Sequence, residues 1–135
     1  MTVSRPDTDN SNIRTVLFDL DGTLLDTAPD LADALNAVLV ENDLSPLPYE
    51  DIRPVVSHGG IALITLGFNM DTSDPRFESL RIRLLELYRD NISRKTRPFP
   101  GITEALEQLE ARGINWGVVT NKPGWLTEPL LRDLD

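Results

Sequence analysis

Two short apolar runs, far apart in the sequence, predict two strands of a parallel sheet. Residues 15–18 read Thr-Val-Leu-Phe, and residues 114–120 read Ile-Asn-Trp-Gly-Val-Val-Thr. The first run does not alternate between apolar and polar side chains, which is typical of a strand covered on both faces, and we expect both strands to be buried. A helix and short loops precede the second strand, so the strands should pair in parallel.

Three segments between the two runs have the spacing of amphipathic helices. Residues 28–42 carry apolar side chains on one helical face, and a second apolar segment runs over 59–66 after a pair of glycines. A third helix begins at Asp74-Pro75. We expect these helices to form one helical unit.

Two local patterns refine this helical unit. Thr27 and Asp30 have the spacing of a capping box, in which the two side chains bond to backbone amides at the start of the first helix. Residues 42–54 contain three prolines and should be mostly loop.

The proline-rich connector Pro98-Phe99-Pro100-Gly101 separates the helical unit from the C-terminal part of the chain. A further helix precedes the second strand, and another begins at Asn121-Lys122-Pro123. This order predicts an α/β fold in which residues 14–21 and 98–135 form a parallel-sheet core, and residues 22–97 form a helical insert after the first strand. Residues 1–13 are polar and are typical of a disordered tail.

Composition narrows the function by exclusion. The net charge of −9 argues against nucleic acid and against an anionic membrane surface as partners. The absence of cysteine excludes disulfides and thiolate metal sites, and a single histidine excludes any site that needs two imidazoles. The N-terminal residues form no apolar secretory segment, so a cytoplasmic protein is the default expectation.

The residues that carry chemistry stand at the carboxyl ends of the two predicted strands, where ligands bind in such sheets. Asp19 and Asp21 follow the first strand, and two close carboxylates are costly unless they bind a cation such as Mg²⁺ or share a proton. An aspartate can also attack phosphorus, while its neighbour acts as a general acid. Thr120 and the amide of Asn121, at the end of the second strand, would suit a phosphoryl group.

Less specific interpretations exist for each of these residues. A bare Asp-x-Asp is more often a solvated strand end, and a single threonine at the end of a strand more often bonds to backbone. A calcium loop of the EF-hand type is set aside, because Gly22 stands at its fourth position and not its sixth.

Taken together, the motifs resemble those of the haloacid dehalogenase superfamily of phosphatases. These motifs are FDLDGTLLDT at 18–27, PFPG at 98–101 and VVTNKP at 118–123, with a helical unit between the first two. The resemblance runs from about residue 14 to 135 and implies that the helical insert is the small cap domain of this family. The segments GGIALITLGFNMD and WGVVTNKP look especially similar to bacterial phosphoglycolate phosphatases, including the subgroup that acts on N-acetylmuramic acid 6-phosphate.

The resemblance implies the hydrolysis of a small phosphorylated metabolite, 2-phosphoglycolate or N-acetylmuramic acid 6-phosphate, through an aspartyl-phosphate intermediate. Asp19 would be the nucleophile and Asp21 the general acid and base, with Mg²⁺ bound by the Asp19 carboxylate and the Asp21 backbone carbonyl. The other residues expected to contact phosphate or substrate are Thr23, Thr120, Asn121, Lys122, His58, Gly59 and Gly60. For His58 an exposed loop position is an equal alternative, and for Lys122 a solvated position near a helix start.

Two later motifs of the family, a lysine and an acidic pair, have no counterpart in this chain. We therefore expect the chain to be the N-terminal part of a phosphatase. The alternatives are a catalytically inactive truncated fragment and a non-enzymatic metal-binding or interaction module. A sheet of two strands exposes both edges, which favours self-association.

Overall fold

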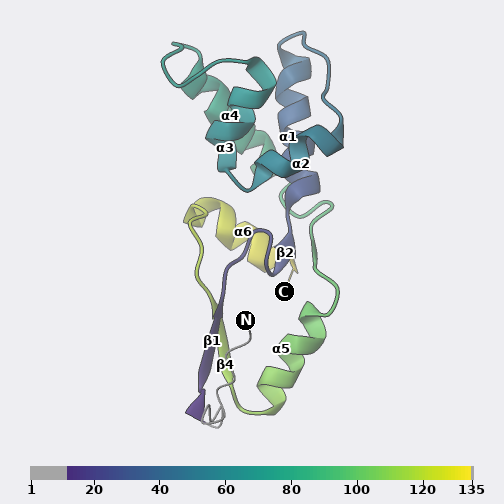
Figure 1. The fold of residues 1–135 in the computed structure, drawn as a ribbon, viewed down its shortest axis with the longest axis vertical. Coiled ribbons are helices and arrows are strands. Elements are labelled where there is room, and N and C mark those ends of the chain that lie inside the picture. Colours follow the sequence, from purple (N-terminus) through teal and green to yellow (C-terminus); the bar gives the residue numbers. More distant parts are fainter. Residues whose placement is uncertain (1–11, 135) are drawn as a thin grey trace, which may run out of the picture.

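The computed structural model describes residues 12–134, and the disordered tail expected over residues 1–13 falls almost entirely outside them. The molecule is elongated, with a group of helices at one end and a pair of strands beside a helix at the other (Figure 1). The elements are, in chain order, β1 (Thr15–Phe18), β2 (Leu25–Asp26), α1 (Ala28–Glu41), α2 (Tyr49–Val56), α3 (Gly59–Phe68), α4 (Phe77–Asp90), β3 (Arg97–Pro98), α5 (Ile102–Ala111), β4 (Asn115–Val118) and α6 (Gly124–Leu134).

Strands β1 and β4 pair in parallel, in a register that places Thr15 opposite Asn115 and Phe18 opposite Val118. The predicted α/β class and the parallel pairing of the two apolar runs are therefore confirmed. Because the pairing is parallel and in register, the residues that follow both strands lie at the same edge of the sheet.

The helices α1 to α4 pack on one another and form the helical end of the molecule (Figure 1). Their contact surface is apolar: Leu35, Val38, Leu63 and Leu84 are fully buried. These residues come from α1, α3 and α4, whose apolar positions recur every three or four residues, so one face of each helix is removed from water. We use the name cap for residues 22–97, and this domain boundary remains a prediction.

Two short segments join the cap to the core. Strand β2 pairs with β3 in antiparallel fashion, so that Leu25 lies opposite Pro98 and Asp26 opposite Arg97. This pairing brings the two points at which the chain enters and leaves the cap side by side, a feature that the sequence patterns did not predict.

The capping-box prediction for Thr27 and Asp30 is wrong. Thr27 stands at the N-cap position of α1, but no side chain donates or accepts a capping hydrogen bond there. The Thr27 hydroxyl donates instead to Asp21, at 2.8 Å. The Asp30 carboxylate is 2% exposed and accepts hydrogen bonds from the amides of Lys95 and Thr96 and from the Thr96 hydroxyl, at 2.7–3.0 Å. Thr27 thus joins the start of α1 to the loop after β1, and Asp30 joins α1 to the segment before β3.

The prediction that β1 and β4 are buried on both faces is also wrong for the described residues. The side chains of β1 alternate between exposed and half-buried, and Leu17 is 63% exposed. In the described part of the chain this sheet consists of β1 and β4 alone. Only the face that carries Phe18 and Val118 packs against the core, so a sequence without alternation forms a strand with one open face.

The expected loop over residues 42–54 contains the start of a helix. Helix α2 begins directly after Pro48 and includes Pro54, although an internal proline removes a helical hydrogen bond. Ile52 on this helix is completely buried, so the packing of α2 against the other helices of the cap outweighs the unfavourable proline. Among residues 12–134, no helix combines the length and the apolar character that crossing a membrane requires.

Candidate active site

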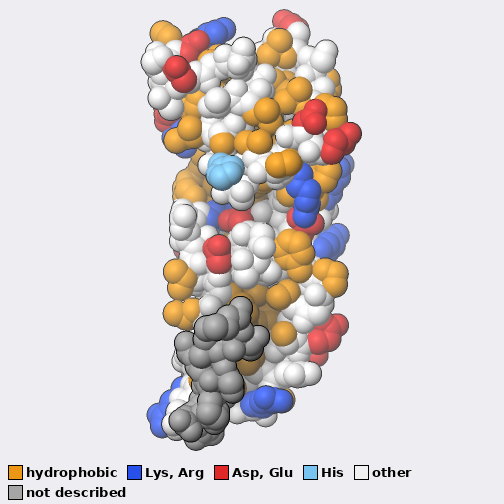
Figure 2. Space-filling view, in the orientation of Figure 1, with side chains coloured by type: hydrophobic (Ala, Val, Ile, Leu, Met, Phe, Trp, Pro, Cys, Tyr) orange, Lys and Arg blue, Asp and Glu red, His pale blue; other side chains and the backbone are white. Residues whose placement is uncertain are grey.

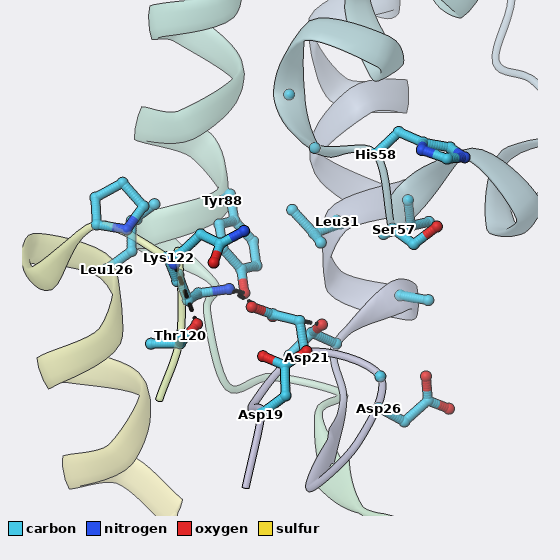
Figure 3. A pocket seen from close by; sticks show the side chains of 18 of the residues that line it. Asp19, Asp21, Asp26, Leu31, Ser57, His58, Tyr88, Thr120, Lys122 and Leu126 are labelled. Carbon is cyan, nitrogen blue, oxygen red and sulfur yellow. Dashed lines mark hydrogen bonds and ion pairs between the residues drawn. The ribbon is translucent and has the colours of Figure 1, made fainter. Parts of the chain in front are cut away.

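The predicted catalytic residues come together where the core meets the cap. Asp19 follows the last residue of β1, and Thr120 lies two residues beyond the end of β4, at the same edge of the sheet. Figure 3 shows both side chains around one space with Asp21 and Lys122, while Tyr88 approaches from the cap. The parallel register of β1 and β4 thus brings together motifs that are about a hundred residues apart in sequence.

The loop after β1 fixes the direction of the Asp19 carboxylate. The amide of Leu20 donates to Asp19 Oδ1 at 2.8 Å, and the Leu20 side chain is completely buried. Gly22 has a φ of 76°, a left-handed conformation that glycine adopts without strain, and its amide donates to the carbonyl of Leu25. The anchored loop leaves Asp19 itself exposed to the cavity.

Asp21 is held by two donors on one carboxylate oxygen. The Thr27 hydroxyl and the Lys122 ammonium both donate to Asp21 Oδ1, each at 2.8 Å. Thr27 stands directly before α1, and Lys122 lies between β4 and α6. The orientation of Asp21 is therefore set from both the cap side and the core side.

Lys122 bridges the core and the cap. Its Nζ atom donates to the hydroxyl of Tyr88 on α4 at 2.6 Å and lies 4.5 Å from the centroid of the Tyr88 ring. The Lys122 side chain is only 7% exposed. Burial lowers its pKa from the ordinary lysine value, against the opposing effect of Asp21, and burial also raises the pKa of Tyr88. The ammonium is thus committed to two partners within the protein.

Thr120 and Asn121 lie beside these charges. The Thr120 hydroxyl oxygen accepts a hydrogen bond from the amide of Lys122 at 3.1 Å, which leaves its proton available for an oxygen of a ligand. Asn121 is exposed at the cavity wall, ahead of the first turn of α6. The structure therefore brings Asp19, Asp21, Thr120, Asn121 and Lys122 to one place.

The cap contributes the opposite wall of the cavity. His58, Gly59 and Gly60 stand at the start of α3 and line the same cavity, but Figure 3 shows His58 apart from the group of Asp19, Asp21 and Lys122. Gly59 has a φ of 83°, a conformation that other residues rarely adopt. Thr23 is exposed and is not among the residues that line the cavity.

The cavity between cap and core has a volume of about 520 Å³, which is large enough for a small organic phosphate. Figure 2 shows acidic and basic side chains exposed together at mid-height of the molecule, below the pale blue histidine. Among residues 12–134, no cluster of three or more acidic or histidine side chains is arranged to enclose a metal ion.

Three residues of this region were not found by the sequence patterns. The helical spacing places Tyr88 only on an apolar face, whereas its hydroxyl reaches Lys122. Arg53 lines the cavity from α2. It was missed because residues 42–54 were expected to be mostly loop. Asp26 also lines the cavity and pairs with Arg53; its place inside the motif FDLDGTLLDT was the only signal for it.

The fold and the site together define a class of protein. Residues 16–135 match the family of haloacid dehalogenase-like hydrolases, and the chain belongs to this family. The resemblance of the sequence motifs to this superfamily is thereby confirmed.

Individual relatives match most of the length of this chain. The N-acetylmuramic acid 6-phosphate phosphatase of Pseudomonas aeruginosa is 40% identical over 122 residues, which cover 90% of this chain and 54% of that protein. The phosphoglycolate phosphatase of Caulobacter vibrioides is 41% identical over 123 residues, which cover 89% of this chain and 52% of that protein. A crystal structure of a predicted phosphoglycolate phosphatase from Haemophilus somnus superimposes with a TM-score of 0.75 at 26% identity, and covers 90% of this chain and 57% of that one. The chain spans about half the length of the curated relatives that it matches.

Proposed function

We propose that these residues form the nucleophile side of a phosphatase site that hydrolyses a small phosphate monoester. The observation that carries the proposal is the meeting of Asp19, Asp21, Thr120 and Lys122 at one cavity, through the parallel pairing of β1 and β4. The named activities of the similar proteins support phosphate esters such as 2-phosphoglycolate or N-acetylmuramic acid 6-phosphate as substrates.

In the proposed first step, a carboxylate oxygen of Asp19 attacks phosphorus. The bond from phosphorus to the ester oxygen breaks, and Asp21, which enters this step protonated on Oδ2, gives that proton to the leaving oxygen. The Thr120 hydroxyl donates a hydrogen bond to a phosphoryl oxygen. The exposed position of Asp19 and the fixed position of Asp21 suit these two roles, because the nucleophile must reach the ligand while the acid must be held in place.

In the second step, water attacks the phosphorus of the aspartyl phosphate and passes a proton to Asp21. Inorganic phosphate leaves, and Asp19 is restored as a carboxylate. Two charged or polar donors, Lys122 and Thr27, hold Asp21 during both steps, so that the same carboxyl group is positioned for the outgoing and the incoming oxygen.

The cofactor that suits this donor set is Mg²⁺, bound by the Asp19 carboxylate and the backbone carbonyl of Asp21. The ion prefers oxygen ligands, keeps several waters and often binds through one or two carboxylates together with substrate phosphate oxygens. Asp19 and Asp21, which both line the cavity, supply oxygen ligands of this kind. When bound, Mg²⁺ neutralises charge on the phosphoryl oxygens.

Phosphate release by the chain with Mg²⁺ tests the proposal on 2-phosphoglycolate, N-acetylmuramic acid 6-phosphate and an aryl phosphate. Asp19→Asn is the test variant, and Asp33→Asn on the exposed face of α1 is the matched control. We expect turnover, and a phosphoryl group on the intact protein by mass spectrometry, in the native chain and the control but not in Asp19→Asn.

A folded chain that shows neither phosphate release nor a covalent phosphoryl group with any of the three esters would contradict the proposal. Binding of Mg²⁺ without either signal would instead favour a non-enzymatic metal-binding module.

A further inference from the structure

The cap contributes one exposed cation to the cavity, the guanidinium of Arg53 on α2. Arg53 lines the same cavity as Asp19 and Asp21, and 46% of its side chain is exposed. Its Nη1 atom lies 3.3 Å from Asp26 Oδ1 and also donates to the hydroxyl of Tyr49. These two contacts fix one corner of the guanidinium at the cap side of the cavity.

The rest of the guanidinium is available to a ligand. All hydrogen bonds of Arg53 within residues 12–134 use Nη1, and neither Nε nor Nη2 has an acceptor among those residues. The N–H groups of Nε and Nη2 point in the same direction from one planar group. Such a pair donates two parallel hydrogen bonds to the two oxygens of a carboxylate.

Stability alone gives little reason for this arrangement. The ion pair of Arg53 with Asp26 is open to solvent, with exposed fractions of 46% and 32%, and pairs of this kind contribute little to folding. The other cation among the described lining residues, Lys122, is buried and already donates to Asp21 and Tyr88. Arg53 is therefore the cation that remains for an anionic group on the cap side.

We propose that Arg53 binds the carboxylate of the substrate and thereby selects phosphate monoesters of hydroxy acids. This inference rests on the proposed function, which places the phosphoryl group beside Asp19 and Thr120. The remainder of the ester then extends toward the cap, where the two free donors of Arg53 pair with its carboxylate. Of the two esters suggested above, 2-phosphoglycolate carries its carboxylate on the same carbon as the phosphate oxygen and is the simplest ester with which to test this role.

A pair of esters separates carboxylate recognition from phosphate recognition. Ethyl phosphate has a methyl group where 2-phosphoglycolate has its carboxylate, and is otherwise the same. We expect Arg53→Gln to lower kcat/KM for 2-phosphoglycolate by about 10- to 100-fold, the effect of losing hydrogen bonds to a charged group. The change for ethyl phosphate should be smaller than about twofold.

Two further variants sharpen the comparison. Arg53→Lys keeps the charge but has no planar pair of donors. Its kcat/KM for 2-phosphoglycolate should therefore lie between the values of the native chain and of Arg53→Gln. Arg76→Gln removes an exposed, ion-paired arginine that does not line the cavity, and should change neither ester. The same substitutions can be compared in an Asp19→Asn background, in which the ester stays intact. Calorimetry should then rank their affinities for 2-phosphoglycolate in the same order as their kcat/KM values.

The outcomes distinguish the two proposals. Equal losses for both esters in Arg53→Gln, or no preference of the native chain for the carboxylate ester, would overturn the role of Arg53 and leave the phosphatase proposal standing. If neither ester is bound or hydrolysed, both proposals fail. An unchanged urea midpoint in Arg53→Gln would show that the effect on substrate choice does not come from unfolding.

Discussion

The Nζ atom of Lys122 lies 2.8 Å from Oδ1 of Asp21, although the two residues are 101 positions apart in the sequence. Through the same atom, Lys122 donates to Tyr88 on the cap helix α4. One buried ammonium therefore connects the loop after β1, the loop after β4 and the cap. Lys122 thus orients Asp21 and contacts the cap through two of its three N–H donors, and its contact with phosphate stays a prediction.

Replacing Lys122 with methionine should both destabilise the chain and impair the proposed reaction. The variant leaves the Tyr88 hydroxyl without its donor and Asp21 with Thr27 as its remaining partner. We expect a loss of about 1–2 kcal/mol in the free energy of unfolding by urea titration, a moderate value because Asp21 is one third exposed. Turnover should fall because Asp21 is no longer held.

The chain offers a matched control, because Lys95 is its other lysine. The ammonium of Lys95 pairs with Asp33 at the surface, with both side chains about half exposed. Lys95→Met should change the free energy of unfolding by less than about 0.5 kcal/mol. Equal effects of the two substitutions would show that the bridge through Lys122 has no special importance.

Asp30 should be among the most sensitive polar residues of the fold. Asp30→Asn keeps the shape of the side chain but removes the charge and turns an amide group toward backbone donors of Lys95 and Thr96. We expect the free energy of unfolding to fall by about 2–3 kcal/mol, because the carboxylate is buried and its hydrogen bonds are charge-assisted. Asp33→Asn, on the exposed side of the same helix, should have almost no effect, and a similar loss in both variants would contradict this account.

The raised pKa of Tyr88 predicts a loss of stability at alkaline pH. At a pH above 10.0, the ordinary pKa of tyrosine, Tyr88 keeps its proton in the folded chain but releases it in the unfolded chain. Above that pH the unfolded state therefore binds fewer protons, so this contribution is complete below pH 10.0 and declines as the pH rises further.

Urea midpoints at about pH 8 and about pH 11 measure this decline. Tyr88→Phe should show a smaller drop between the two pH values than the native chain. Tyr49→Phe, which removes the other tyrosine at an exposed position, should keep the full drop. A native-sized drop in Tyr88→Phe would mean that other groups cause the alkaline loss.

The adjacent glycines at the start of α3 should respond in opposite ways to alanine. Gly59 has a φ of 83°, so Gly59→Ala should cost about 1–2 kcal/mol of stability in strain. A Cβ atom on Gly60 would meet its nearest neighbours at 3.6–3.8 Å, which is ordinary contact. Gly60→Ala should therefore be neutral or stabilise by up to about 1 kcal/mol, since alanine favours a helix. Thermal unfolding of the two variants side by side checks the contrast.

The sequence was sufficient for the features that depend on periodicity and on motif. The helical spacing of residues 28–42 and the parallel pairing of the two apolar runs were confirmed. The roles of Asp19, Asp21 and Thr120 remain predictions, but the structure places their side chains around one cavity, as residues at the carboxyl ends of neighbouring parallel strands should be.

The features that the sequence could not predict depend on distant partners. Thr27 and Asp30 have the spacing of a local cap, and only the fold shows that Asp21 and the segment around Thr96 compete successfully for their side chains. In the same way, Pro54 is an unfavourable residue in a helix, and the burial of Ile52 decides the outcome. Local sequence patterns indicate propensities, whereas tertiary contacts determine the partners of Thr27 and Asp30 and the helix that contains Pro54.

The contact between Asp30 and Thr96 has a consequence for the route by which the chain folds. Strands β1 and β4 must find each other across a very long stretch of chain, and closing a long loop is entropically unfavourable and slow. Once Asp30 has bound the amide of Thr96, and β2 has paired with β3, the start and the end of the cap are joined. The residues of the cap then no longer add to the length of the loop that must be closed. Only the short segments outside the cap then remain to be closed. We therefore expect assembly of the cap to precede the meeting of Asp19 with Thr120, and Asp30→Asn to slow the formation of the cavity between cap and core.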